Sequence, residues 1–417
     1  MQKRYVENTL NTKDIDDFLE SHNLQRLLTT EIEHILARLP AFPVTGHSSS
    51  IYHGQTGVLY LLFHIHNLDP SFTVAGDPVA ELCVMYLTAI TKSIGGLDSK
   101  HCGFIDSPVG VLALAACVSH VVLRKDYKAR LYVEKLLEYQ DIALMNHTSD
   151  ELLYGRAGYL YALELVQLHC RDLVIDLISD QMRLDVIHKI IENGHNGAID
   201  NWPLMWSWHD RKYIGAAHGA AGIVGVLLQC GQLVDEWKDE LLTVAKNICE
   251  LTLPNDNVPP HLGSQKDELV QFCHGVPGII PCLTLIERLY PSASNTFLSY
   301  AERYANCVWN NGLLRKSVGL CHGISGNAFA FLELYLIKPQ CIEYLHKAAA
   351  FCRFATDWRE HTSRKVLETS DSPHSLFGGN AGLAWLLIDL WRITLPADQR
   401  TDVKERPGGF PCFTDLI

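Results

Sequence analysis

The strongest pattern in the chain is a series of almost wholly apolar stretches, each of which follows a pair of small residues three positions apart. Examples of these stretches lie at 58–63, 111–122, 223–228 and 383–391. They recur roughly every 50 to 60 residues, near the upper end of the periods of helical repeats. A helix that is apolar on all sides is buried on all sides. The pattern therefore predicts a set of buried helices at regular intervals along the chain.

The segments between these stretches have an apolar stripe and a charged face. Apolar residues recur at i, i+4, i+7, i+8 and i+11 from Trp237 to Ile248, and the segments 131–144 and 341–358 are similar. This spacing is typical of an amphipathic helix that covers a core, and no convincing run has the alternation of a strand. Buried and amphipathic helices in alternation predict an all-α fold, an α/α toroid with seven inner and seven outer helices.

Glycine pairs mark the predicted start of each inner helix. In the second pair, serine replaces the first glycine. The pairs are Gly54 and Gly57, Ser107 and Gly110, Gly155 and Gly158, Gly219 and Gly222, Gly275 and Gly278, Gly323 and Gly326, and Gly379 and Gly382. Because all inner helices would start at one end of the toroid, their N-termini should converge on one axial cavity that favours thiolates and anions. The alternative is that the glycines merely allow the inner helices to pack closely. We expect the glycines to serve close packing and also to place the helix N-termini around the cavity.

The repeats predict one domain, 46–417, preceded by an N-terminal helical arm, 1–45. The arm should contain a helix from Glu31 to Leu39, and the chain from Pro396 onward resembles a loop and a short tail. A closed ring of repeats accommodates a chain of 417 residues without a second core.

Composition narrows the function. Asp and Glu outnumber Lys and Arg by 47 to 35, a net charge of −12, which argues against nucleic acid as a partner because phosphate binding needs a basic face. Thirteen scattered cysteines and the absence of a signal-peptide pattern indicate a cytoplasmic protein with reduced thiols. The apolar runs, roughly 6 to 15 residues long, are too short to span a membrane.

Cys-His-Gly occurs twice, at Cys273 to Gly275 and at Cys321 to Gly323. Thiolate and imidazole are ligands that Zn²⁺ selects, and neither copy alone supplies enough of them. The best ligand set is Cys273, Cys321 and His322, one Zn²⁺ per chain, with the fourth position open as in catalytic sites. An open zinc binds a thiol as the nucleophilic thiolate. The alternative is that the histidines are only hydrogen-bonded structural residues.

Two histidines are candidate acids. His218 precedes the fourth glycine pair and should face the same cavity, where it could protonate a carbanion formed by thiolate addition. His274 is a second candidate if it does not bind metal. The alternative for His218 is a helix cap.

Further polar residues near the glycine pairs are possible substrate contacts. Lys316 lies five residues before Cys321 and could hold an anion near the metal, whereas Asp and Ser before a helix more often cap it. The other candidates are Glu151, Tyr154, Arg156, Asp371 and Ser372.

Several motifs in order resemble the lanthionine synthetase C-like (LanC-like) family over nearly the whole chain. They are the run from Leu153 to Tyr159, the run from Gly215 to Gly219, the two Cys-His-Gly turns and Ser375-Leu376-Phe377. The resemblance implies an α/α toroid with a central zinc, ligands at Cys273, Cys321 and His322, and an acid at His218.

The resemblance is to the eukaryotic branch, which implies glutathione as the thiol and dehydroamino acids in proteins or peptides as partners. Leu269, His274 and Glu151 stand where bacterial cyclases tend to have arginine, tyrosine and aspartate, so peptide cyclisation is not expected. Lys316 and Arg4 match family contacts to glutathione, whereas Glu368 stands where close relatives place an arginine.

The sequence therefore predicts a zinc-dependent glutathione transferase that forms thioethers. One alternative is a sensor or scaffold that binds zinc and glutathione without turnover. Another is a sugar-active toroid, for which Glu151 and Asp371 are the only carboxylates that could form the required pair.

Overall fold

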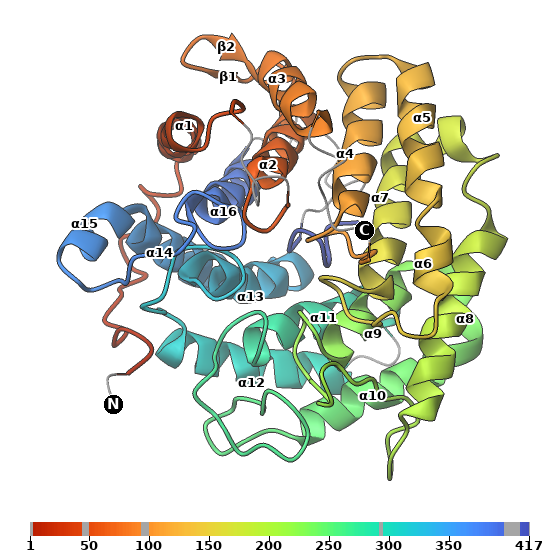
Figure 1. Ribbon diagram of the computed structural model, residues 1–417. Coiled ribbons are helices and arrows are strands. Elements are labelled where there is room, and N and C mark those ends of the chain that lie inside the picture. Colours follow the sequence, from red (N-terminus) through yellow and green to blue (C-terminus); the bar gives the residue numbers. More distant parts are fainter. Residues whose placement is uncertain (1–2, 44–49, 93–99, 292–294, 396–408, 417) are drawn as a thin grey trace.

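A computed structural model of the chain describes residues 3–43, 50–92, 100–291, 295–395 and 409–416. In this part of the chain seven helices form an inner ring, in which each helix contacts the next and the last contacts the first. Figure 1 looks into this ring. The inner helices are α2 (Gln55–Leu68), α4 (Pro108–Val121), α7 (Arg156–Val174), α9 (Ala220–Gln229), α11 (Val276–Leu289), α13 (Ile324–Ile337) and α16 (Asn380–Thr394).

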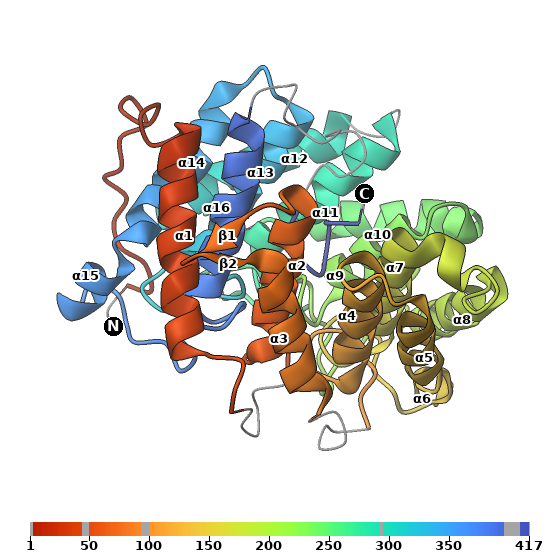
Figure 2. The ribbon, with the colours of Figure 1, turned by 90° about the horizontal axis from the view of Figure 1, so that it is seen from above.

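In the described part of the chain, seven further helices surround this inner ring. Each packs on the inner helix that precedes it in the chain, except the first, which packs on α16. Figure 2 shows this pairing of α1 and α16 from above. The outer helices are α1 (Ser21–Arg38), α3 (Val79–Thr91), α5 (Asp126–Leu137), α8 (Asp180–Asn196), α10 (Lys238–Glu250), α12 (Asn295–Asn311) and α14 (Ile342–Thr356). The α/α toroid expected from the sequence is confirmed.

Smaller elements connect the rings. They are a hairpin of β1 (Thr73–Val74) and β2 (Asp77–Pro78), the short helices α6 (Gln140–Leu144) and α15 (Trp358–Ser363), and the 3₁₀ helix η3 (Gly231–Trp237). The amphipathic segment expected at 131–144 is thus divided between α5 and α6. None of the helices in the described residues combines the length and the apolar character that crossing a membrane requires.

The N-terminal arm is part of the ring wall. Its helix α1 begins at Ser21, ten residues before the start expected from the sequence, and packs on α16 as an outer helix. The buried carboxylate of Glu31 accepts hydrogen bonds from Arg359 (2.7 Å) and Asn380 (2.8 Å). These contacts hold α1 against the first turn of the inner helix α16.

The C-terminal residues 409–416 lie inside the ring, not on its surface. Phe410 stacks on Phe272, directly before Cys273, with ring centres 3.7 Å apart. Asp415 accepts hydrogen bonds from the hydroxyls of Tyr60 (2.6 Å) and Tyr161 (2.8 Å), which belong to α2 and α7. The short tail expected from the sequence therefore fills the centre of the toroid.

Candidate active site

The second glycine of each pair is required by close packing. In all seven turns, a Cβ on this glycine would lie 1.8 to 2.6 Å from the carbonyl oxygen of the residue six positions earlier. Real Cβ atoms essentially never come within 3.0 Å of a heavy atom from elsewhere in the chain. The loop before each inner helix therefore folds back onto the first turn of that helix, and the same geometry recurs seven times.

This geometry gives each turn two equivalent positions, five and four residues before the second glycine. The first set is Tyr52, Ile105, Leu153, Ala217, Cys273, Cys321 and Phe377, and the second is His53, Asp106, Tyr154, His218, His274, His322 and Gly378. Almost all of these residues line one cavity of about 520 Å³. The N-termini of the inner helices converge on this cavity, as the sequence predicted.

Backbone contacts between adjacent turns bring the two Cys-His-Gly copies together. The amide of Cys273 donates to the carbonyl of Cys321 (3.2 Å), and the amide of Cys321 donates to Phe377 (3.0 Å). On the other side, a Cβ on Gly215 would lie 2.3 Å from the carbonyl oxygen of Cys273. The turn that carries His218 is therefore pressed directly against the first copy.

The donor atoms of Cys273, Cys321 and His322 all lie within 4.8 Å of one another. Both thiols are buried, and His322 is partly exposed to the cavity. In the described residues this is the only group of three or more Cys, His, Asp or Glu side chains with this spacing. The three side chains form a candidate metal site with room for a further ligand on the cavity side.

The two thiols are not electrostatically equivalent. A hydrogen bond from Cys321 lowers the pKa of Cys273 well below that of an ordinary thiol, and the pKa of Cys321 is raised by the same contact. The side-chain amide of Gln271 also donates to the sulfur of Cys273 (3.1 Å). The pair therefore readily gives up the first of its two protons, which favours a thiolate ligand.

His218 lies on the cavity wall between a carboxylate and an indole ring. Its Nδ1 atom is 2.7 Å from Oε2 of Glu151, and its ring stacks on Trp208 with centres 3.8 Å apart. Glu151 also accepts hydrogen bonds from the backbone amides of Leu153 (3.0 Å) and Tyr154 (2.7 Å). Glu151 therefore holds His218 in place, and its carboxylate faces away from any ligand in the cavity.

His274 follows Cys273 in the chain, and its ring centre lies 6.3 Å from that of His218. Burial lowers its pKa below the ordinary histidine value. Its Nδ1 atom has no hydrogen-bond partner among the described residues. His274 is not part of the three-donor cluster, although it occupies the position equivalent to His322.

Lys316, Glu368, Asp371 and Ser372 line the same cavity on the side of Cys321. Tyr154 also lines this cavity. Arg4 is exposed and is not among the lining residues, but its carbonyl accepts a hydrogen bond from the amide of Arg315 (2.9 Å). The arm therefore passes beside Lys316.

Similarity to known proteins identifies the family. The sequence profile described as "Lanthionine synthetase C-like protein" matches residues 46–394. The chain belongs to this family. It is 34% identical over 373 residues to a Danio rerio protein named glutathione S-transferase LANCL1, covering 87% of this chain and 84% of that one. It is 31% identical over 312 residues to the Arabidopsis thaliana LanC-like protein GCL1, covering 72% and 70%.

The fold of this LanC-like protein is also similar to that of nisin cyclase. The TM-score is 0.64 at 16% sequence identity, with 93% of this chain and 98% of that chain covered. At this identity the likeness shows the fold only.

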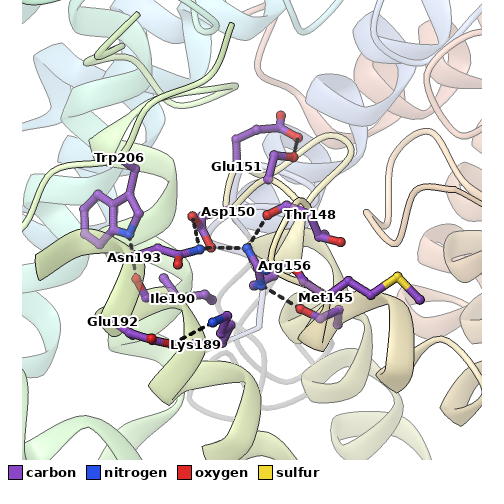
Figure 3. Close-up of polar contacts among 12 residues, drawn as sticks. Met145, Thr148, Asp150, Glu151, Arg156, Lys189, Ile190, Glu192, Asn193 and Trp206 are labelled. Carbon is purple, nitrogen blue, oxygen red and sulfur yellow. Dashed lines mark hydrogen bonds and ion pairs between the residues drawn. The ribbon is translucent and has the colours of Figure 1, made fainter. Parts of the chain in front are cut away.

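Three predicted substrate contacts of the LanC-like chain, Arg4, Glu151 and Arg156, are not among the residues that line the cavity. Arg156 is fully buried and donates to Asp150 (2.7 Å) and to the backbone carbonyls of Ala143, Met145 and Thr148, as Figure 3 shows in part. Arg156 therefore lies within this buried network and not at the surface of the cavity. The physical reason is its position: the residue after the first glycine begins the inner helix and is buried in all seven turns.

Several cavity residues were not expected from the sequence, and four of them are Tyr52, His53, Asp106 and Gln271. Three of them carry a signal that the sequence contains. Tyr52 stands five residues before Gly57, as Cys273 stands before Gly278, and His53 and Asp106 stand four residues before their glycines, as His322 stands before Gly326. Trp208 has no such signal, because it reaches His218 from a separate hairpin turn.

Proposed function

We propose that this LanC-like protein is a zinc-dependent enzyme that adds the thiol of glutathione to electrophiles such as dehydroalanine and dehydrobutyrine in proteins or peptides. The observation that carries the proposal is the arrangement of one cavity. Cys273, Cys321 and His322 meet on one wall, and His218, oriented by Glu151, stands on another.

The three donors suit zinc. Two thiolates and one imidazole are the soft and borderline ligands that zinc selects. Zinc–sulfur distances of about 2.3 Å in a tetrahedral site place neighbouring sulfurs about 3.8 Å apart, which the separations of up to 4.8 Å permit. When bound here, zinc would supply a Lewis acid that stabilises a thiol in its thiolate form.

The remaining residues would act on the substrates. Lys316 places a positive charge in the cavity, where it can bind a carboxylate of glutathione. Addition forms a bond between the glutathione sulfur and the β-carbon of the acceptor, and the π electrons of the alkene move to its α-carbon. His218 then donates a proton to the α-carbon, which completes the addition of S–H across the double bond.

The similarities support thiol chemistry. The Danio rerio relative carries the name glutathione S-transferase. All thirteen cysteines are free thiols, which suits the reducing cytoplasm where we propose that the protein acts. Leu269, His274 and Glu151 differ from the residues expected of bacterial cyclases, so we propose intermolecular addition and no ring formation.

The test combines metal content, ligand binding and turnover on one set of samples. Zinc is measured by elemental analysis, glutathione binding by calorimetry, and thioether formation with a dehydroalanine peptide by mass spectrometry. The variants are Cys273→Ala and, as a control thiol outside the cavity, Cys341→Ala. We expect about one zinc per chain in the wild type and the control, and loss of zinc, glutathione binding and product in Cys273→Ala.

Two outcomes would change the assignment. A wild type that binds zinc and glutathione but forms no thioether would favour the sensor or scaffold. A wild type without zinc, or a Cys273→Ala variant that keeps it, would contradict the metal site.

A further inference from the structure

A second and larger cavity lies beside the candidate active site. Its volume is about 1330 Å³, above the range of about 300 to 1,000 Å³ that is typical of small-molecule pockets. Tyr154 lines both cavities, and Trp208 lines the larger one while its ring covers His218. We call this larger cavity the side groove. Tyr154 and Trp208 stack on each other and form its boundary with the active-site cavity.

The floor of the side groove is fixed by a buried network, shown in Figure 3. Arg156, beneath the floor, binds the carbonyls of Met145 and Thr148 and the carboxylate of Asp150, and these three residues line the groove. Asn193 from α8 donates to the same carboxylate (3.0 Å). The loop before α7 and the end of α8 are thereby tied together, so the groove is formed before any ligand arrives.

The same loop connects the groove to the proposed acid. Asp150 faces the floor network, and its neighbour Glu151 binds His218. A ligand that rests on this loop would therefore lie at a fixed distance from His218 and from the metal site.

The lining chemistry suits a peptide backbone. Lys100 and Asp150 are the only Lys, Arg, Asp or Glu side chains among the described lining residues, and Asp150 is paired with Arg156. Most other lining groups are side-chain amides, hydroxyls, imidazoles and two indoles. They include Asn146, Asn193, Asn196, Ser207, Trp206 and Trp208. Amides and hydroxyls pair with both the N–H and the C=O groups of an extended chain, and indoles provide flat surfaces for its side chains.

We infer that the side groove binds the acceptor as an extended polypeptide, through the residues that flank its dehydroamino acid. The alkene of the dehydroamino acid then reaches over Tyr154 and Trp208 to the metal site. This inference rests on the proposed function and assigns the acceptor to the side groove, leaving the Lys316 side of the active-site cavity for glutathione. It makes the preferred electrophile one carried on a polypeptide, and a free small molecule a poor substrate.

The test fills the groove without touching the active-site cavity. Ser207 is exposed and lies between Trp206 and Trp208, so Ser207→Trp places an indole in the groove. Ser299→Trp on the exposed side of α12 is the matched control. Both variants and the wild type are assayed with glutathione and two acceptors, a peptide with dehydroalanine at its centre and N-acetyldehydroalanine amide. Binding of the same peptide with alanine at its centre is followed by fluorescence anisotropy.

We expect Ser207→Trp to lower kcat/KM for the peptide at least about tenfold, equivalent to about 1.4 kcal/mol, with zinc content and the rate of the small acceptor unchanged. Ser207→Trp should also abolish binding of the alanine peptide as measured by fluorescence anisotropy, whereas Ser299→Trp should retain this binding. Equal kcat/KM for the two acceptors in the wild type, or peptide binding unaffected by Ser207→Trp, would overturn the inference. Absence of product from both acceptors would instead contradict the proposed function, and the alanine peptide would still test the groove.

Discussion

The Nδ1 atom of His218 lies 2.7 Å from Oε2 of Glu151, whose side chain is 1% exposed. Two backbone amides fix the carboxylate, so the imidazole can present only its Nε2 atom to the cavity. A buried carboxylate in this position sets the orientation of the imidazole ring. The pair is arranged to deliver a proton at one point of the cavity.

Replacing Glu151 should therefore impair the proton transfer and spare the metal site. In Glu151→Gln the carboxylate charge is lost, and the amide nitrogen cannot accept from the backbone amides. We expect kcat for thioether formation to fall at least about tenfold, and by no more than the about 10⁴-fold that acid–base catalysis contributes. Zinc content and glutathione affinity should stay at wild-type values.

Glu192→Gln, which changes an exposed carboxylate paired with Lys189, is the control and should leave kcat unchanged. A loss of zinc in Glu151→Gln would show that the residue only supports the fold.

The two histidines of the Cys-His-Gly copies should differ in metal binding. His322 contributes to the three-donor cluster, whereas His274 stands apart from it. Elemental analysis of His322→Ala should show zinc reduced to a small fraction of one per chain after dialysis against a weak chelator. His274→Ala should keep its zinc under the same treatment. The reverse result would move the ligand set to the other copy.

The sequence predicted the ring and the convergence of the cysteines because both follow from a repeated local requirement. The second glycine of each pair is needed wherever a loop folds back onto an inner helix, and this marks each turn without knowledge of the rest of the fold. Contacts that depend on packing between distant segments carry no such mark. Trp208 reaches His218 from another loop, and Phe410 reaches Phe272 from the end of the chain. Arg156 belongs to the same motif as the glycines, but the motif determines only the position of its backbone. The direction of its side chain could not be predicted from the motif.

Gly275 should be needed for full stability and for tight zinc binding at the metal site. Its φ is +115°, which disfavours any other residue, and a Cβ there would lie 2.0 Å from the carbonyl oxygen of Leu269. Gly275→Ala must shift the turn that carries Cys273, so we expect a loss of at least about 1–3 kcal/mol in the free energy of unfolding and weaker zinc retention. Gly263 also has positive φ (+78°), but no atom lies within 4 Å of its Cβ position. Gly263→Ala should cost about 1 kcal/mol and keep its zinc. Chemical denaturation and elemental analysis of both variants test this, and equal behaviour would contradict it.

Asp415, in the C-terminal segment 409–416, should make stability depend on pH. Burial between Tyr60 and Tyr161 raises its pKa to about 6, above the value of about 3.9 in an unfolded chain. Because the folded state holds this proton more tightly, the stabilisation is complete below pH 4 and is lost as the pH rises through 6. Two pKa units correspond to a change of at most about 3 kcal/mol in the free energy of unfolding.

The variant Asp415→Asn lacks this titrating group, and all other groups titrate in both proteins. Denaturant unfolding at pH 4.5 and pH 7 should therefore show the wild type losing stability relative to Asp415→Asn as the pH rises. Parallel pH profiles would mean that the carboxylate is hydrated in the folded protein and that the tail does not seal the centre of the ring.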